Sequence, residues 1–263
     1  YDWGDVTLPV SRVREYPTPM PDPIKSFKPR HWAIASAFVL AAMGATVSTR
    51  AQDDMPKVDA ALILSLDVSS SVDNKRYQLQ MEGIAAALED DAVINTILGG
   101  ANGAILISMV TWADKAKLSI PWTMIANADQ AKALARTVRS LPQQEGSFTC
   151  AGRMARYIAD KVVARLPAKA EKIVVDVSGD GPDNCNTGQL LDNARSDLFG
   201  IGVTINGLPI LEGKDAVTIE EWYKDNIIGG PGAFIVAAKG YEDFARAFRQ
   251  KFVVEVSANF TKP

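Results

Sequence analysis

From residue 58 onwards, short apolar runs alternate with helical patterns. The apolar runs predict six strands, at 58–66, 104–112, 117–124, 172–177, 202–206 and 233–237. Apolar residues spaced three or four apart predict helices at 74–88, 129–140, 150–166, 188–197, 218–226 and 241–252. Pro121 suggests that 117–124 lies at an edge. This alternation predicts an α/β fold: a doubly wound, mostly parallel six-stranded sheet with helices on both faces.

The first 31 residues have a different pattern. Four prolines alternate with other residues between positions 17 and 23. Because proline fixes φ and disfavours helix in the residue before it, residues 1–31 are predicted to form an extended strap. Such a strap has no core of its own and is either disordered or docked on a partner.

Residues 32–48 form an uncharged apolar run, which follows the basic residues Lys25, Lys28 and Arg30 in the sequence. The run could be a secretory signal cleaved near residues 49–51, or an uncleaved signal-anchor helix that crosses a membrane. Both interpretations leave the basic flank in the cytoplasm and export the rest. We favour the anchor. The predicted location is therefore the bacterial inner membrane, single-pass, with a periplasmic domain; the alternative is a soluble periplasmic protein.

The predicted organisation is therefore a strap and an apolar helix before one globular domain. A linker at 49–57 leads to a domain at 58–253, and residues 254–263 form a tail. Of the 263 residues, 47% are hydrophobic, which is enough for one sizeable core. The net charge of −3 and the scattered basic residues exclude a nucleic-acid partner.

Histidine chemistry is almost excluded, because the single histidine, His31, lies beside the apolar run. The polar residues that remain gather where predicted strands end, and open parallel sheets bind ligands outside those ends. The first strand runs into D-x-S-x-S, which is Asp67, Ser69 and Ser71. Carboxylate and hydroxyl oxygens suit Mg²⁺, Ca²⁺ or Mn²⁺, although such a turn can also simply cap a helix.

Two further loops strengthen the metal interpretation. Thr149 precedes a predicted helix, and Asp180 follows the strand at 172–177 in Ser-Gly-Asp-Gly. With the first loop, these motifs and their order resemble the von Willebrand A, or integrin I-like, superfamily over about residues 58–252. The stretch 202–210 resembles an uncharacterised bacterial subgroup of that superfamily, a domain of unknown function.

The resemblance implies a metal-ion-dependent adhesion site. Ser69, Ser71 and Thr149 would be direct ligands, and Asp67 and Asp180 would bind directly or through water. Mg²⁺ is the expected cofactor, with Ca²⁺ or Mn²⁺ as alternatives, and the open position would take a carboxylate from a protein partner. The middle loop departs from the family pattern, with Gly-Ser-Phe-Thr in place of Gly-Gly-Thr.

The same resemblance places Cys150 and Cys185 on two of the metal loops, where they are a possible disulfide. An exported domain would favour oxidation. The alternative is a pair of small buried thiols.

Three functions are consistent with these features. The first is an exported, membrane-anchored binding or scaffolding module that is not an enzyme. The second is a structural accessory subunit of a larger membrane complex, docked through residues 1–48, whose metal only stabilises the fold. The third is a metal-dependent hydrolase, which is disfavoured because no phosphate loop, nucleophile elbow or second aspartate of a D-x-D loop is present.

Overall fold

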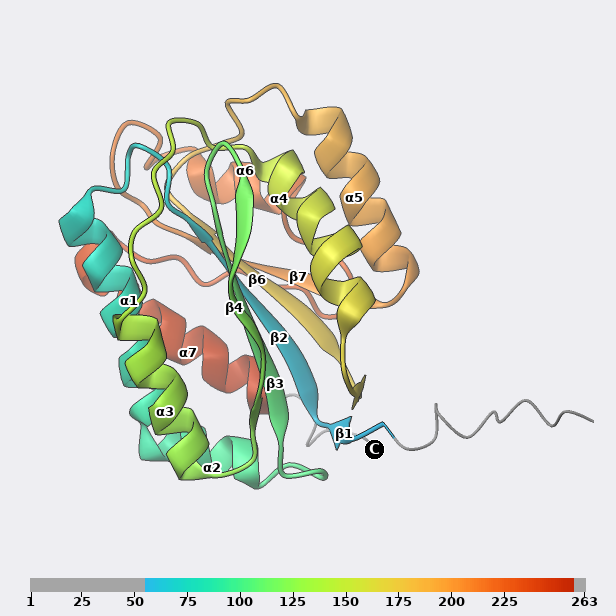
Figure 1. Ribbon diagram of the computed structural model, residues 1–263. Helices are drawn as coiled ribbons and strands as arrows, with labels where there is room; N and C mark the ends of the chain where they lie inside the picture. Colours follow the sequence, from blue (N-terminus) through green and yellow to red (C-terminus); the bar gives the residue numbers. More distant parts are fainter. Residues whose placement is uncertain (1–54, 258–263) are drawn as a thin grey trace, which may run out of the picture. The chain divides into compact units, whose positions relative to one another are not determined.

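The computed structural model describes residues 55–257, which fold around one central sheet (Figure 1). The five strands lie in the order β4-β3-β2-β6-β7. Their bounds are β2 Ala60–Asp67, β3 Ile105–Trp112, β4 Ala116–Ile125, β6 Ile173–Gly179 and β7 Val203–Pro209. All neighbours pair parallel except β4, which is antiparallel to β3 at the edge that Pro121 predicts. A separate two-stranded sheet joins β1 (Lys57–Val58) to β5 (Lys169–Ala170).

Helices cover both faces of this sheet (Figure 1). One face carries α1 (Asn74–Glu89), α2 (Asp91–Leu98), α3 (Ala128–Arg139) and α7 (Phe244–Ser257). The other carries α4 (Ala151–Tyr157), α5 (Gly188–Gly200) and α6 (Ile219–Asn226). A π-helical turn (Ile158–Val162) and a 3-10 turn (Val163–Arg165) extend α4, and a 3-10 turn (Tyr241–Asp243) precedes α7. The predicted doubly wound architecture is confirmed.

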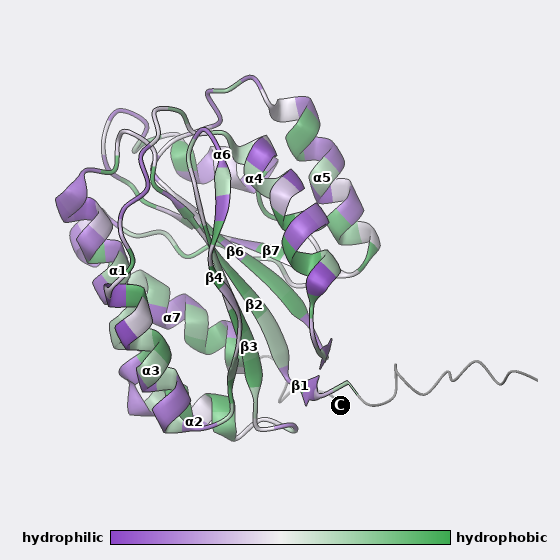
Figure 2. Cartoon of the chain, viewed as in Figure 1, coloured by the Kyte–Doolittle hydropathy of each residue, from purple (hydrophilic) through white to green (hydrophobic). Residues whose placement is uncertain are grey.

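Burial explains why the strands could be recognised in the sequence. Every residue of β2 and β3 is buried, and Figure 2 shows these strands as hydrophobic, whereas the helices alternate in hydropathy. A strand covered on both faces must be apolar throughout, which gives the continuous runs. The phenylalanine stripe of α7 is core as predicted, with Phe244, Phe248 and Phe252 buried and stacked in series.

The predicted sixth strand at 233–237 is wrong. This segment lies beside β7 and makes only isolated bridges to it, at Gly207–Ile235 and Ile210–Ala238. The break falls at Pro209, which has no N–H to donate to the neighbouring segment. The apolar segment therefore pairs with its neighbour only at single positions before and after Pro209, and it does not form a continuous strand.

The predicted single-pass inner-membrane location requires correction. None of the helices in residues 55–257 is long and apolar enough to cross a membrane, which contradicts that location. The apolar run at 32–48 and the strap at 1–31 lie outside the described residues, so the structure shows no apolar helix before the domain.

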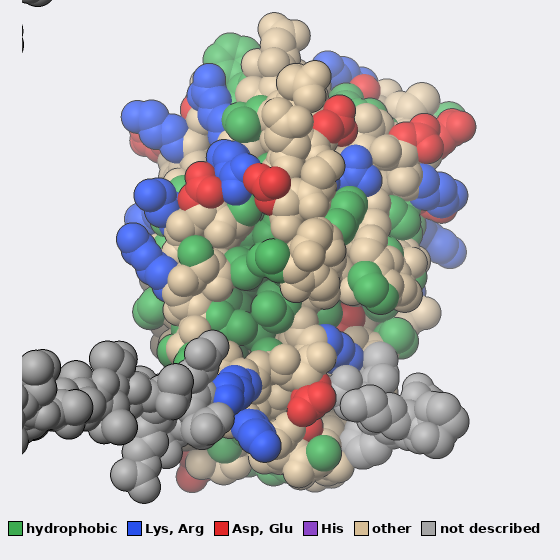
Figure 3. All heavy atoms as spheres, turned by 90° about the vertical axis from the view of Figure 1, so that its right-hand side faces the viewer, with side chains coloured by type: hydrophobic (Ala, Val, Ile, Leu, Met, Phe, Trp, Pro, Cys, Tyr) green, Lys and Arg blue, Asp and Glu red, His purple; other side chains and the backbone are tan. Residues whose placement is uncertain are grey.

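Charges of both signs are interspersed on the side of the molecule shown in Figure 3. On α4, for example, Arg156 pairs with Asp160 at 2.6 Å and with Asp197 of α5 at 2.6 Å. Exposed pairs of this kind contribute little to stability but keep a surface soluble and free of single-sign patches.

One charged network lies inside the domain, between the sheet and α7. Asp176 of β6 is 2.6 Å from the ammonium of Lys251, which also pairs with Glu255. The amide of Asn206 on β7 donates to the Glu255 carboxylate at 2.7 Å. Burial raises the pKa of Asp176 to about 7, although the nearby Lys251 opposes that shift. Since burying a lone charge is costly, the lysine is what allows these carboxylates to remain in the core.

We predict that Lys251→Met destabilises the domain by about 3 to 5 kcal/mol, because it removes the buried ammonium that pairs with both Asp176 and Glu255. Urea unfolding of the full chain measures this. The matched control is Lys75→Met, which removes a lysine from the exposed pair with Glu242 and should change stability by less than about 1 kcal/mol. Equal losses in the two variants would show that the buried network carries no special weight.

Candidate metal site

The predicted ligands come from three loops at one edge of the sheet. β2 ends at Asp67, and its neighbour β6 ends one residue before Asp180. The two strands are parallel, so their carboxyl ends meet, at the top of Figure 1. The third loop precedes α4 and carries Thr149. The parallel register therefore brings together residues that are more than 100 positions apart.

The hydroxyl and carboxylate oxygens of these loops form a chain of short contacts. Thr149 Oγ1 donates to Ser69 Oγ at 3.2 Å, and Ser69 Oγ is 3.3 Å from Ser71 Oγ. Ser71 Oγ donates in turn to Asp180 Oδ1 at 2.6 Å. Asp67, the last residue of β2, accepts a hydrogen bond from the Ser69 amide at 2.8 Å. The structure thus brings all five predicted residues together.

This oxygen set fits a small divalent cation. Ligands about 2.1 Å from Mg²⁺ on perpendicular axes are about 3 Å apart, close to the spacings found here. Among residues 55–257, no three acidic, histidine or cysteine side chains gather as a metal-binding group, so the hydroxyls are essential to the set. The other carboxylate oxygen, Asp67 Oδ2, is buried with no hydrogen-bond partner in the described structure.

Electrostatics at Asp67 point the same way. The pKa of the Asp67 carboxyl is raised to about 7, mainly by burial and to a smaller extent by the Asp180 carboxylate, while hydrogen bonds from Ser69 oppose the shift. A cation between the two aspartates would offset both the desolvation and the repulsion.

The site opens to solvent through a cavity of about 220 Å³. Ser69, Thr149 and Asp180 are almost fully buried, whereas Ser71 is exposed. Asp73 caps α1 by accepting a hydrogen bond from the Arg76 amide at 2.8 Å.

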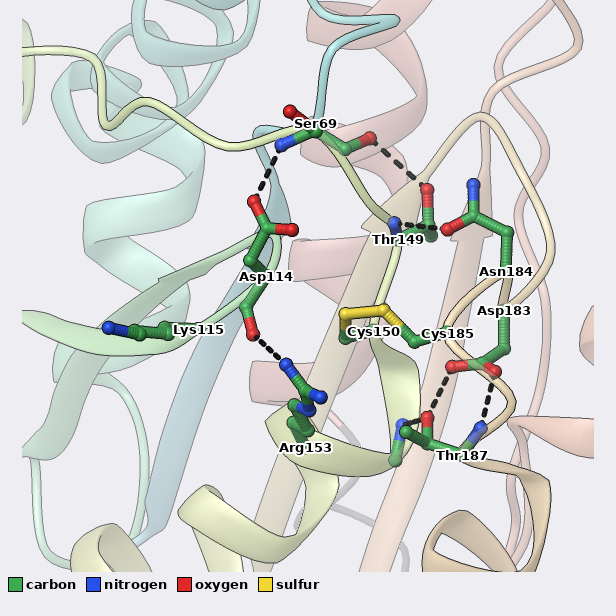
Figure 4. Close-up of a disulfide and its surroundings, with 12 residues drawn as sticks. Ser69, Asp114, Lys115, Thr149, Cys150, Arg153, Asp183, Asn184, Cys185 and Thr187 are labelled. Atoms are coloured by element: carbon green, nitrogen blue, oxygen red, sulfur yellow. Dashed lines mark hydrogen bonds between the residues drawn. A yellow bond between two sulfur atoms is a disulfide. The ribbon is translucent and has the colours of Figure 1, made fainter.

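Two hydrogen bonds and a disulfide join the second and third loops (Figure 4). The side-chain oxygen of Asn184, Oδ1, accepts from the Thr149 backbone N–H at 2.8 Å, and the backbone N–H of Asn184 donates to the Thr149 carbonyl at 3.0 Å. Cys150 and Cys185 form the predicted disulfide, with Cα atoms 5.1 Å apart. These contacts hold the Thr149 backbone in place. Ser147 is held by other contacts: its amide donates to Asp114 Oδ2 at 2.6 Å, and its carbonyl accepts from Ser70 Oγ.

The sequence did not reveal an arginine and a glutamate that hold the first loop. The guanidinium of Arg76 donates to the Ser71 carbonyl and to Glu212 Oε1, at 2.8 Å from Nη2. Glu212 Oε2 accepts in turn from the Tyr241 amide at 2.9 Å. Arg76 lies in the first turn of α1, but Glu212 is 136 residues away, and no local motif links them.

Two buried tyrosines beneath the site were also missed. A Cβ at Gly179 would be 2.9 Å from Asp67 Cβ and 3.0 Å from Tyr223 Oη, so the close packing of these two side chains favours glycine at that position. Burial raises the pKa of Tyr223, and the Asp67 and Asp180 carboxylates raise it further. Burial likewise raises the pKa of Tyr241, again with help from both aspartates. Both phenols therefore stay protonated next to the carboxylates.

Comparison of the sequence with known families identifies a relationship that covers the whole described domain. The family model described as "Protein of unknown function (DUF1194)" matches residues 57–260. The chain belongs to this family. No curated protein matches the chain.

Solved structures show that this family has the von Willebrand A fold. Proximal thread matrix protein 1 from the mussel byssus is 14% identical with a TM-score of 0.58, over 77% of this chain and 48% of that one. A von Willebrand factor type A protein from Catenulispora acidiphila is 18% identical with a TM-score of 0.54, over 76% of this chain and 43% of that one.

A pilus adhesin, SpaC from Lactobacillus rhamnosus GG, is 14% identical with a TM-score of 0.54, over 77% of this chain and 30% of that one. The chain therefore spans less than half the length of these three proteins. A further structure of the mussel protein, 15% identical with a TM-score of 0.55, is described as having a zinc-occupied MIDAS motif. These likenesses confirm the predicted von Willebrand A-like fold, and the family model confirms the predicted domain of unknown function.

We predict that the double variant Cys150→Ser/Cys185→Ser is less stable than the wild type by about 3 to 4 kcal/mol, because the bridge closes a loop with a sequence separation of 35 residues. Guanidinium unfolding measures this loss. Wild-type protein treated with reductant should match the variant, and a variant as stable as the oxidised protein would contradict the prediction.

Proposed function

We propose that the domain is a protein-binding module whose metal site presents a divalent cation, Mg²⁺ in the first instance, to a carboxylate of a partner protein. Ser69, Ser71 and Thr149 would be direct ligands, and Asp67 and Asp180 would bind directly or through water. When bound, the cation supplies an electrophilic position for an anionic ligand.

The observation that carries this proposal is the grouping of five oxygen-bearing side chains, of which Thr149, Ser69, Ser71 and Asp180 are linked in a chain of contacts and Asp67 accepts from the Ser69 amide. The three oxygen–oxygen contacts in this chain, 2.6 to 3.3 Å long, are close to the edge length of an octahedron around Mg²⁺. Asp67 adds a buried carboxylate whose second oxygen lacks a partner within the described domain. An unpaired buried carboxylate is costly, and a cation beside it would remove that cost.

A binding role is favoured over a catalytic one. The hydroxyl and carboxylate oxygens at the site lie close enough to one another to bind one cation, which supports a binding role, and the only histidine of the chain is His31. The Tyr223 and Tyr241 phenols are held protonated by burial, so neither serves as a base near neutral pH. The mussel matrix protein and the pilus adhesin, which share the fold, support an interaction role.

We expect Mg²⁺ to stabilise the full chain against thermal unfolding, by about 2.7 kcal/mol at one hundred times its dissociation constant. Asp67→Asn should abolish this response, and Ser71→Ala should weaken Mg²⁺ binding at least about tenfold, which calorimetry measures directly.

Ser70→Ala is the matched control, because Ser70 lies between two candidate ligands but its hydroxyl donates to the Ser147 carbonyl. Its Mg²⁺ affinity should stay within about twofold of the wild type. The proposal fails if the wild type binds neither Mg²⁺, Mn²⁺ nor Ca²⁺, or if Ser70→Ala and Ser71→Ala lose the same affinity.

A further inference from the structure

A disulfide joins the two metal loops that carry Thr149 and Asp180. Cys150 directly follows Thr149, and Cys185 lies in the segment that follows Asp180. The sulfur atoms are not candidate ligands, but a change at the bridge reaches Thr149 through a single peptide unit. Thr149 is therefore the candidate ligand whose position depends most directly on the disulfide.

The backbone of Thr149 is hydrogen-bonded to Asn184, the residue beside Cys185 (Figure 4). The Thr149 N–H donates to Asn184 Oδ1 at 2.8 Å, and the Thr149 carbonyl accepts from the Asn184 N–H at 3.0 Å. Asn184 is exposed, so water competes for both hydrogen bonds when the two loops separate. The disulfide opposes that separation, because it links the residues that follow Thr149 and Asn184.

The segment at 181–187 depends on such contacts for its shape. It lies between β6 and α5 and belongs to neither. Within it, Asn186 has a left-handed φ of 55°. Asparagine tolerates this conformation better than most residues, but it still costs free energy and persists only where neighbouring contacts hold it. Since Cys185 precedes Asn186, opening the bridge allows this turn to relax.

Other contacts keep the loops near each other when the bridge is open. Thr187 Oγ1 accepts from the Gly152 N–H at 3.0 Å, and Asp183 Oδ2 accepts from the Thr187 N–H at 2.9 Å. The first metal loop is held separately, through Arg76. Reduction should therefore loosen Thr149 and leave the ligands of the first loop in place.

We infer that the oxidation state of the Cys150–Cys185 pair regulates the affinity of the site for its cation, with Thr149 as the ligand through which the bridge acts. The oxidised form, in which Thr149 Oγ1 lies 3.2 Å from Ser69 Oγ, is the high-affinity form. The inference rests on the proposed function, since it concerns the cation proposed there. By linkage, a cation that prefers the oxidised form must make the disulfide harder to reduce by the same factor.

The reductant that opens the bridge is a dithiol. One of its thiolates attacks the Cys185 sulfur, because Cys185 is half-buried whereas Cys150 is fully buried. The S–S bond breaks, Cys150 leaves as a thiolate and takes up a proton, and a mixed disulfide forms at Cys185. The second thiol of the dithiol then closes its own disulfide and releases Cys185 as a thiol. Two electrons and two protons pass from the dithiol to the protein.

The test compares Mg²⁺ binding by the oxidised and the dithiothreitol-reduced full chain in calorimetry, since Mg²⁺ has little affinity for thiols. Reduction should weaken Mg²⁺ binding about tenfold, as expected when a ligand loses its supporting contacts. Conversely, saturating Mg²⁺ should lower the reduction potential of the cysteine pair by about 30 mV, which is the same tenfold factor. Cys150→Ser/Cys185→Ser should bind Mg²⁺ as the reduced wild type does, with no response to dithiothreitol.

Thr149→Ala tests whether the bridge acts through Thr149. Reduction should change the Mg²⁺ affinity of this variant by less than about twofold, because the ligand that the bridge positions is already gone. The matched control is Ser71→Ala, which removes a candidate ligand from the first loop instead. Reduction should still weaken Mg²⁺ binding by that variant about tenfold.

The outcomes separate this inference from the proposed function. If the oxidised wild type binds no divalent cation, the proposed function falls, and this inference falls with it. If the oxidised and reduced forms bind Mg²⁺ equally, or reduction weakens Thr149→Ala as much as the wild type, only the inference is overturned. Unfolding of the reduced domain, seen by circular dichroism, also overturns it, because the bridge would then act on the fold as a whole.

Discussion

The structure around the candidate site depends on one constraint, the burial of a carboxylate at the end of a fully apolar strand. Asp67 is completely buried, and the strand before it has no polar surface toward solvent. Only one of its oxygens has a hydrogen-bond partner among the described residues. An isolated carboxylate in such a position would be strongly destabilising, so its surroundings must supply either positive charge or a proton.

The surroundings are rigid rather than adaptable. Arg76 and Glu212 fix the first loop, whereas the Cys150–Cys185 disulfide and Asn184 fix the other two relative to each other. Each loop is therefore held by contacts that do not involve the cation. Preorganised oxygens lose little conformational freedom when an ion binds, so more of the interaction energy becomes affinity.

The sequence was most informative where one physical effect dominates. Burial on both faces makes β2 and β3 continuous apolar runs, and the helical spacing of the α7 phenylalanines reflects one buried stripe. It was misleading at 233–237, where the apolar run is real but Pro209 on the neighbouring strand interrupts the ladder. A pattern within one segment carries no information about the hydrogen-bonding capacity of the segment beside it.

The same distinction separates the site residues. Asp67, Ser69, Ser71, Thr149 and Asp180 were predicted because each lies in a recognisable loop motif in the expected order. Glu212 and Tyr241 were missed because they act only through tertiary contacts, such as that of Glu212 with Arg76, 136 positions away. Their chemistry, an acid and a phenol, is too common in sequences to be a signal. Supporting residues of this kind become visible only once the sheet register is known.

Donor chemistry also bears on which cation the proposed site would prefer. Hydroxyl and carboxylate oxygens are hard ligands, whereas zinc sites in proteins are usually built from histidine and cysteine. In the described domain both cysteines are in the disulfide. Ca²⁺ binds oxygens at about 2.3 to 2.6 Å with six to eight ligands, which needs a wider and more flexible cage. Loops tied together by a disulfide, with oxygens 2.6 to 3.3 Å apart, favour the smaller octahedral ion. The rigidity that holds Asp67 in place is thus also the argument for Mg²⁺.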